Sequence, residues 1–325
     1  MTPKSKIIII SGATATGKTS SSITLALGLE KIGIKAEIIN FDSLLFYDEI
    51  TIGTAKPTLE EQKGVPHHLV GTVSIKQDYN SSHFRTDAKA ILNQLIKNNI
   101  TPILVGGSAF YIRALLKGMY SATDISDVTK EKLNNLINNT TSPGQVLMSY
   151  LEEHDPESAQ KLHVNDEYRL TRAVEYHLQT NTPFSAQAKI AEKNNPYDLT
   201  SNLDLPVEPL HFNLDIPKEE QWPIIQERTK QMISSGLIEE VKDLLSRGFD
   251  KNLKALRSVG YVETINFIEG TLQSIDELEE RINISTRQLA KSQRTFFKKI
   301  VGSHKVHPLK TPELIKEISI NFLTK

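Results

Sequence analysis

The sequence contains no cysteine among its 325 residues. Disulfides, thiolate catalysis and cysteine-ligated zinc fingers are therefore excluded, and any metal must have oxygen or histidine ligands. No apolar run approaches the ~18 residues that a membrane span requires. Lys4 and Lys6 lead directly into a strand pattern rather than into a signal peptide. We therefore expect a cytoplasmic protein with no membrane partner.

The sequence also lacks an excess of charge of either sign, because the formal net charge is −1. This balance argues against a nonspecific nucleic-acid coat but permits a local basic groove. Apolar residues make up 38% of the chain, which is enough to fill the core of one large domain or two modest ones.

The most informative feature that is present is a phosphate-binding loop. The apolar run Ile7 to Ile10 predicts a buried strand, and it leads into Gly12-Ala13-Thr14-Ala15-Thr16-Gly17-Lys18-Thr19, followed by a helical pattern. We expect the loop amides to converge on phosphate oxygens, Lys18 to add positive charge, and the Thr19 hydroxyl to ligate Mg²⁺. A glycine-rich turn without a ligand is the alternative interpretation.

A second strand is predicted at residues 36–41, and it ends at Asp42-Ser43. In an open α/β sheet the carboxyl ends of the strands form the ligand-binding edge, so Asp42 is expected to face the phosphate loop. Three roles are open to this carboxylate. It can ligate Mg²⁺ through water, accept a proton from a nucleophile, or cap the turn that follows.

Further motifs follow in order along the chain. They are Ile52-Gly53-Thr54-Ala55-Lys56-Pro57-Thr58, Val65-Pro66-His67-His68-Leu69, Ile103-Leu104-Val105-Gly106-Gly107-Ser108, Arg169-Leu170-Thr171-Arg172-Ala173-Val174-Glu175, Arg257-Ser258-Val259-Gly260-Tyr261 and Thr286-Arg287-Gln288-Leu289-Ala290-Lys291. Together with the phosphate loop and Phe41-Asp42-Ser43, these motifs resemble those of the tRNA dimethylallyltransferases. That family prenylates the adenosine on the 3′ side of the anticodon. The resemblance spans most of the chain.

The predicted fold class is α/β, a parallel sheet like that of P-loop NTPases, flanked by helices and carrying an inserted all-helical domain. Strand and helix signals alternate over residues 1–120 and resume over 206–325, beginning with a strand at 210–214. Helical segments near 128–139, 143–153 and 165–180 mark the insertion, placed at 121–205. The resemblance implies that this insertion grips the anticodon stem-loop of tRNA.

The resemblance also implies the chemistry. Dimethylallyl diphosphate would place its diphosphate on the 12–19 loop, held by Lys18 and by Mg²⁺ on Thr19. Asp42 would take the proton of the exocyclic adenine amine as that nitrogen attacks the allylic carbon. Relatives place an arginine on the diphosphate where this chain has Lys218. The catalytic residues implied by the resemblance are therefore Lys18, Thr19, Asp42 and Lys218. Arg228 and Arg113 are the alternatives for that contact.

Basic residues predict where RNA phosphates bind. Arg287, Lys291, Arg294 and Lys298 recur at spacings of +4, +3 and +4, which places them on one stripe of a helix. Arg169 and Arg172 share a face of another helix, which Asn165 is expected to cap. An ordinary solvated helix face is the alternative for either set.

The full set of tRNA contacts implied by the resemblance is Asp42, Ser43, Leu44, Leu45, Ser108, Tyr168, Arg169, Arg172, Arg287, Lys291 and Arg294. Many relatives carry Arg-Gln where this chain has Leu44-Leu45, which removes polar contacts at that turn. The partners expected are tRNA and dimethylallyl diphosphate, the cofactor is Mg²⁺, and the protein is expected to be a monomer.

Three other functions remain open to the sequence. A P-loop small-molecule kinase would use the same loop for a nucleoside triphosphate. An adenine-nucleotide prenyltransferase would use the same donor with a free acceptor. A noncatalytic RNA-binding protein would retain the loop without using it. The insertion and the basic stripe have no evident purpose in a small-molecule kinase or in a nucleotide prenyltransferase. Intact Lys18, Thr19 and Asp42 argue against a noncatalytic RNA-binding protein.

Overall fold

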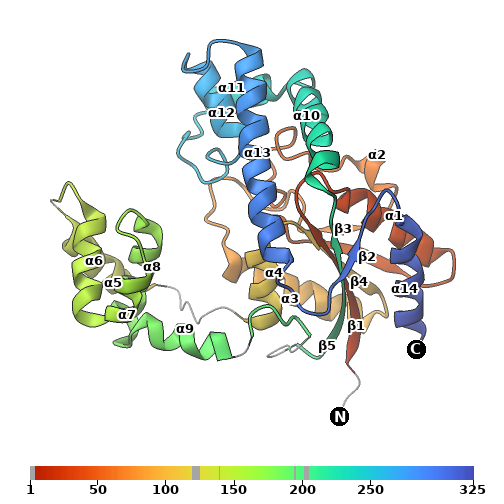
Figure 1. Cartoon of the computed structure of the whole chain (residues 1–325), viewed down its shortest axis with the longest axis horizontal. Helices are drawn as coiled ribbons and strands as arrows, with labels where there is room; N and C mark the ends of the chain where they lie inside the picture. The colour runs from red at the N-terminus through yellow and green to blue at the C-terminus, as the bar shows by residue number, and fades with distance from the viewer. Residues whose placement is uncertain (1–3, 119–124, 139, 194, 201–204) are drawn as a thin grey trace. The chain divides into compact units, whose positions relative to one another are not determined.

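The computed structural model describes residues 4–118, 125–138, 140–193, 195–200 and 205–325 (Figure 1). The chain divides into two compact units, the core unit of residues 1–117 and 199–325 and the helical unit of residues 118–198. The expected domain boundary at 120–121 lies within 119–124, outside the described residues. The core is expected to resume at residue 206. Residues 201–204, just before that boundary, are also outside the described residues.

The core unit is built on a parallel sheet of six strands in the order β3-β2-β4-β1-β5-β6. The strands are β1 (Ser5–Gly12), β2 (Ala36–Asn40), β3 (His67–His68), β4 (Thr101–Gly106), β5 (Val207–Leu214) and β6 (His304–Val306). This sheet confirms the predicted fold class. Because the strands are parallel, the carboxyl ends of β1, β2 and β4 lie at one edge, and that edge carries the site.

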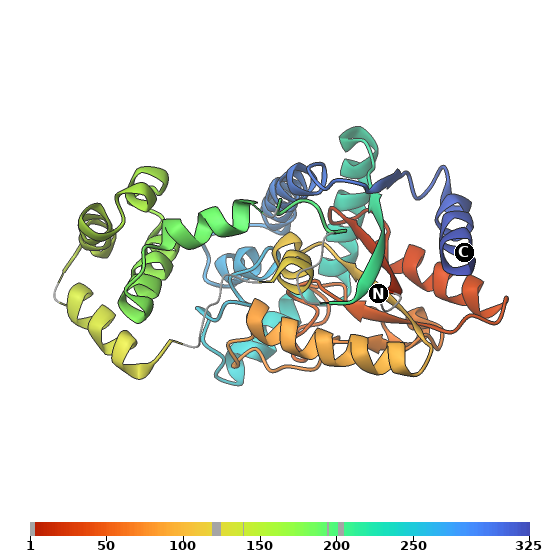
Figure 2. The ribbon, with the colours of Figure 1, turned by 90° about the horizontal axis from the view of Figure 1, so that it is seen from below.

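Helices cover both faces of this sheet. They are α1 (Lys18–Glu30), α2 (Leu59–Gln62), α3 (Ser81–Lys97), α4 (Ala109–Lys117), α10 (Lys218–Ser234), α11 (Leu237–Ser246), α12 (Tyr261–Ile268), α13 (Ile275–Phe297) and α14 (Pro312–Thr324). Figures 1 and 2 show α14 beside α1. No helix among the described residues is long and apolar enough to cross a membrane.

Burial on both faces explains the continuous apolar run of β1. Ile7 and Ile9 belong to the hydrophobic cluster formed with α3, α4 and α11 to α13. Ile8 and Ile10 belong to the cluster formed with α1 and α14. All four side chains are fully buried, so both helical layers hold β1, and the loop that follows it, in place.

The helical unit has its own hydrophobic core. Its helices are α5 (Asp127–Ile137), α6 (Pro143–His154), α7 (Pro156–Lys161), α8 (Glu167–Thr180) and α9 (Phe184–Lys193). Leu147, Leu151, Leu170 and Val174 form the centre of that core, with Leu133 packed beside them. The three helices expected near 128–139, 143–153 and 165–180 are confirmed as α5, α6 and α8.

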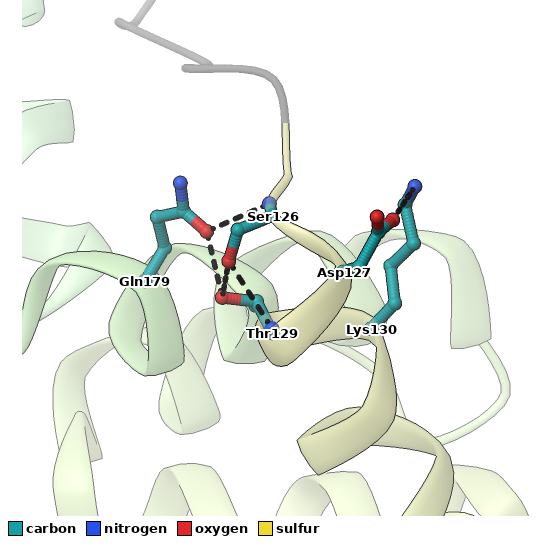
Figure 3. Close-up of polar contacts among 5 residues, drawn as sticks. All are labelled: Ser126, Asp127, Thr129, Lys130 and Gln179. Carbon is teal, nitrogen blue, oxygen red and sulfur yellow. Dashed lines mark hydrogen bonds and ion pairs between the residues drawn. The ribbon is translucent and has the colours of Figure 1, made fainter.

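Polar contacts fix the start of α5 against α8 (Figure 3). The Gln179 side-chain oxygen accepts hydrogen bonds from the Ser126 amide at 3.1 Å and from the Thr129 hydroxyl at 2.6 Å. The Ser126 hydroxyl caps α5 by accepting from the Thr129 amide at 3.2 Å. One glutamine therefore orients the amino terminus of α5.

The expected cap of α8 was wrong by one residue. Asp166, and not Asn165, is the N-cap, and its carboxylate accepts from the Arg169 amide at 3.2 Å. Asn and Asp are almost equally good caps, so two adjacent candidates could not be separated by residue type. The cap is decided by which residue first has its carbonyl bonded within the helix, and here Leu170 donates to Asp166.

Candidate functional site

The predicted phosphate loop joins β1 to α1. Gly17 is the N-cap of α1 and has a φ of 76°, a left-handed conformation in which glycine has no steric penalty. The loop is tied to itself, because the carbonyl of Ala13 accepts from the Thr16 hydroxyl and from the Lys18 amine, both at 2.8 Å. Thr19 stays exposed in the first turn of α1. This is the geometry that presents helix amides to an anion.

A cavity opens beside this loop. It is lined by Thr14, Lys18, Thr19, Ser22, Ile38, Asn40, Asp42, Leu45, Thr54, Ala55, Pro57, His67, Val70, Val105, Gly106 and Arg228. The phosphate loop and α1, the strands β2, β3 and β4, the loop before α2, and α10 therefore all contribute to the cavity. The fold brings the predicted Lys18, Thr19 and Asp42 to one cavity and adds Arg228. Lys218 is not among the lining residues.

Asn40 positions Asp42. The Asn40 side chain is buried. Its Oδ1 accepts a hydrogen bond from the Asp42 amide at 2.8 Å, and its Nδ2 donates to the carbonyls of Leu69 at 2.9 Å and Asp42 at 3.1 Å. The Asp42 carboxylate accepts from the Leu44 amide at 3.2 Å through Oδ1. A Cβ placed on Gly107 would lie 3.4 Å from Asp42 Oδ2 and 3.4 Å from the Gly12 carbonyl. Asp42 thus caps its turn with one oxygen and lies near the phosphate loop with the other.

The cavity has an excess of positive charge. Burial lowers the pKa of Lys18 from its usual value to about 8, although the Asp42 carboxylate opposes the shift and Arg228 adds to it. Burial likewise lowers the pKa of Arg228, again opposed by Asp42. Two cations therefore accompany one carboxylate in a partly desolvated cavity. Such a site favours an anion with more than one charge.

Two glutamines that the sequence analysis missed hold the phosphate loop. Gln293 of α13 accepts from the Thr14 amide at 2.8 Å and donates to the Gly107 carbonyl at 3.0 Å. Gln221 of α10 is fully buried and donates to the Thr14 carbonyl at 2.7 Å. Both polar backbone groups of Thr14 are thereby bonded by side chains, which preorganises the loop. Neither glutamine has a sequence signal, since a polar residue on an amphipathic helix ordinarily marks the solvent face.

Comparison with known proteins identifies the family. A family model described as IPP transferase matches residues 45–300. A tRNA dimethylallyltransferase from Pelotomaculum thermopropionicum is 36% identical to this chain over 91% of it and 88% of that relative. The chain belongs to the IPP transferase family. A second tRNA dimethylallyltransferase, from Petrotoga mobilis, is 34% identical and covers 98% of this chain and 99% of its own length.

Solved structures agree with this membership of the IPP transferase family. The tRNA delta(2)-isopentenylpyrophosphate transferase from Staphylococcus epidermidis is 29% identical to this chain and has a TM-score of 0.67. The match covers 99% of this chain and 100% of that structure. A eukaryotic dimethylallyltransferase acting on tRNA has a TM-score of 0.80 at 24% identity, a likeness of fold, and covers 98% of this chain and 80% of its own. The phosphate loop and Asp42 precede the residues matched by the family model, so their assignment depends on the geometry above.

The turn after β2 carries the first group of expected tRNA contacts. The Ser108 hydroxyl accepts from the Ser43 amide at 3.0 Å and donates to the Ser43 hydroxyl at 3.2 Å. Ser108 therefore secures the turn that carries Asp42. Leu45 lines the cavity and Leu44 is half-buried.

The stripe of basic residues on α13 is not uniformly available to RNA. Arg294 has a side chain only 20% exposed, donates to Gln221, and lies 3.7 Å from a carboxylate oxygen of Asp215. Arg287 is paired with Glu280 at 3.0 Å. Lys291 is exposed, and Lys298 is exposed at the C-cap. Spacing alone could not reveal that Arg294 points toward the residues supporting the phosphate loop.

Trp222 of α10 brings two of the expected cations together. Trp222 is 42% exposed, and the Arg287 guanidinium and the Lys218 amine lie 5.5 Å and 5.9 Å from the centroid of its ring. Lys218 itself has a side chain 59% exposed, with its amine 3.7 Å from Glu219. Cation–π attraction accounts for this grouping. The exposed indole was missed because one aromatic residue on a helix has no distinctive pattern.

The helical unit holds the remaining expected contacts on α8. Tyr168 is 75% exposed. Arg169 is paired with Asp166 at 3.1 Å, and Arg172 with Glu175 at 2.8 Å. Both arginines are therefore neutralised locally, and an RNA phosphate has to compete with a carboxylate for each of them.

Proposed function

We propose that this protein transfers a dimethylallyl group from dimethylallyl diphosphate to the exocyclic N6 amine of the adenosine 3′-adjacent to the anticodon in tRNA, releasing diphosphate. The observation that carries the proposal is the cavity in which Lys18, Arg228 and Asp42 lie together. Its positive charge suits a diphosphate, and its carboxylate suits an acceptor that must lose a proton. Membership of the IPP transferase family supports the same reaction.

The reaction exchanges one bond for another at the allylic carbon and moves one proton. The bond between the allylic carbon and the diphosphate oxygen breaks, its electron pair leaves with the diphosphate, and the N6 nitrogen bonds to that carbon. Asp42 takes the proton that N6 releases. Lys18 and Arg228 stabilise the charge that grows on the leaving oxygens, together with the amides at the start of α1.

The described residues fit a Mg²⁺ ion that enters with the diphosphate. They contain no group of three His, Cys, Asp or Glu side chains suited to a metal. Mg²⁺ commonly binds through one or two protein oxygens together with substrate phosphates and water. The Thr19 hydroxyl on the cavity wall is the protein oxygen that we assign to it. When bound, the ion would offset negative charge on the departing diphosphate.

The contact to the leaving group is testable, because Arg228 lines the cavity and Lys218 does not. We expect Arg228→Ala to lower kcat/KM for dimethylallyl diphosphate by about 10²-fold, the effect of removing one preorganised donor. Lys218→Ala should have a much smaller effect, and Lys218→Arg should behave like the parent. Steady-state transfer to an anticodon stem-loop measures all three. Equal losses in Lys218→Ala and Arg228→Ala would assign the contact to Lys218 as well.

For the acceptor, we propose that the helical unit grips the anticodon stem-loop through Tyr168, Arg169 and Arg172. In the core unit we propose Lys291, Arg287 and the turn at Asp42 and Ser43 as the RNA contacts. The adenine has to leave its stack to reach Asp42, as for other enzymes that modify a base. We further propose that the protein is a monomer and acts in the cytoplasm, where its tRNA substrate is found.

Transfer to an anticodon stem-loop and to AMP, compared across a salt series, tests this function. We expect efficient transfer to the stem-loop and little to AMP. If arginines and lysines neutralise RNA phosphates, the affinity for the stem-loop falls as the salt concentration rises. Each lost contact then reduces the slope of log affinity against log salt concentration by roughly 0.7–0.9. Arg169→Ala combined with Arg172→Ala should show that reduction while donor affinity is retained.

Two controls separate the other functions. Labelled ATP is supplied with the same acceptors, since a kinase would transfer phosphate rather than a prenyl group. Salt-insensitive prenylation of AMP, with none of the stem-loop, would identify an adenine-nucleotide prenyltransferase instead.

A further inference from the structure

The loop between β2 and α2 forms one wall of the cavity. Thr54, Ala55 and Pro57 line it from this loop. Ile38 and Val105 line it from the sheet, and both are buried. The cavity therefore has apolar lining residues as well as Lys18 and Arg228. If the proposed function holds, the diphosphate lies against Lys18 and Arg228, and the five-carbon chain of the donor lies against the apolar lining residues.

A single carboxylate from α11 holds this loop. Glu240 Oε2 accepts from the amides of Thr51 at 2.9 Å and Ile52 at 2.8 Å, and Oε1 accepts from the Gly53 amide at 3.2 Å. Three successive backbone amides thus converge on one anionic side chain. Hydrogen bonds to a charged acceptor are stronger than those between neutral groups, so this contact orders the loop.

Tyr261 of α12 completes the arrangement. Its hydroxyl donates to Glu240 Oε1 at 2.6 Å, and its ring is fully buried. A Cβ added to Gly53 would lie 2.4 Å from the Tyr261 ring, so only glycine allows the loop to approach it. The motif at residues 52–58 and the motif at 257–261 are thereby joined through Glu240. Figure 1 shows α11 and α12 side by side.

The other end of the loop has separate anchors. Lys56 donates to the carbonyls of Tyr47 at 2.7 Å and Asp48 at 3.0 Å. Arg228 donates to the Thr54 carbonyl at 3.3 Å. Weakening Glu240 should therefore loosen one end of the wall and leave the rest of the loop attached.

We propose that Glu240 and Tyr261 form a clamp that holds residues 51–57 as the wall of the prenyl pocket, and so set the affinity for the prenyl chain of the donor rather than for its diphosphate. This inference rests on the proposed function. Both side chains are positioning residues, since they act through the loop and do not themselves line the cavity.

A comparison of two ligands distinguishes binding of the prenyl chain from binding of the diphosphate. Binding of dimethylallyl diphosphate and of inorganic diphosphate, each with Mg²⁺, is measured by calorimetry for the parent, Glu240→Gln and Tyr261→Phe. Glu239→Gln is the matched control, an exposed neighbour on the same helix. We expect Glu240→Gln to weaken dimethylallyl diphosphate binding about tenfold, as the loss of a charged hydrogen bond would. Inorganic diphosphate binding should be unchanged.

Kinetics and folding complete the test. Transfer to the stem-loop should show KM for the donor rising more than kcat falls in Glu240→Gln, with Tyr261→Phe showing a smaller change in the same direction. Equal weakening of both ligands, or none, would overturn the clamp. If Glu240→Gln does not fold, Tyr261→Phe decides, and a folded Tyr261→Phe with parental donor affinity overturns the proposal. Absence of transfer by the parent would instead refute the proposed function, independently of the clamp.

Discussion

Replacing Asp42 with alanine is expected to lower the rate of prenyl transfer by about 10²–10⁴, the usual contribution of a general base. The tRNA affinity should remain close to that of the parent, because Asp42 is one contact among many. Asp42 lies in the cavity with Lys18 and Arg228, and Asn40 fixes its backbone. Single-turnover prenylation of the stem-loop measures the chemical step directly.

The structural role of Asp42 requires a control, because its Oδ1 also accepts from the Leu44 amide. Asp42→Asn keeps an oxygen that can accept this hydrogen bond but cannot take a proton at neutral pH. We expect Asp42→Asn to be almost as slow as Asp42→Ala. A fast Asp42→Asn would show that Asp42 serves the turn, and near-parental transfer by Asp42→Ala would remove it from the mechanism.

Replacing Lys18 with alanine is expected to reduce donor affinity and turnover together. The amine binds the diphosphate before and during the reaction, so its loss affects both the ground state and the transition state. A decrease of about 10²–10³ in kcat/KM is expected from the loss of one preorganised cation. Titration with inorganic diphosphate and steady-state kinetics measure the two effects. Unchanged diphosphate affinity would contradict the assignment of the phosphate loop.

The pH dependence of donor binding provides a second measurement on Lys18. Its pKa is lowered to about 8 by burial, so the amine is charged below that pH and loses its charge as the pH rises through it. Diphosphate affinity in the parent should therefore fall above pH 8. Because bound diphosphate raises the pKa of Lys18, the affinity should fall from about pH 8 up to the pKa of the complex and level off above it. Lys18→Ala should lack this part of the pH dependence, whereas Lys218→Ala should retain it.

Local sequence was sufficient to predict the phosphate loop and its flanking elements. A glycine at a left-handed position, an apolar run buried on both faces and a following helix are properties of adjacent residues. For the same reason Asp42 could be placed at the sheet edge from its position after the second strand. Three of the five described central helices, α5, α6 and α8, were also predicted correctly, because each has its own apolar face, whereas α7 and α9 were not predicted.

The tertiary structure decided the order of the strands, the surroundings of each cation and the residues that support the loops. Gln221, Gln293 and Glu240 hold loops that are 187–279 residues away in the sequence. Arg228 enters the cavity whereas Lys218, ten positions earlier on the same helix, stays outside it. Arg294 turns toward Gln221 although its spacing matches that of exposed Lys291. Helical periodicity specifies which residues share a face, but the packing of helices on the sheet decides what that face contacts.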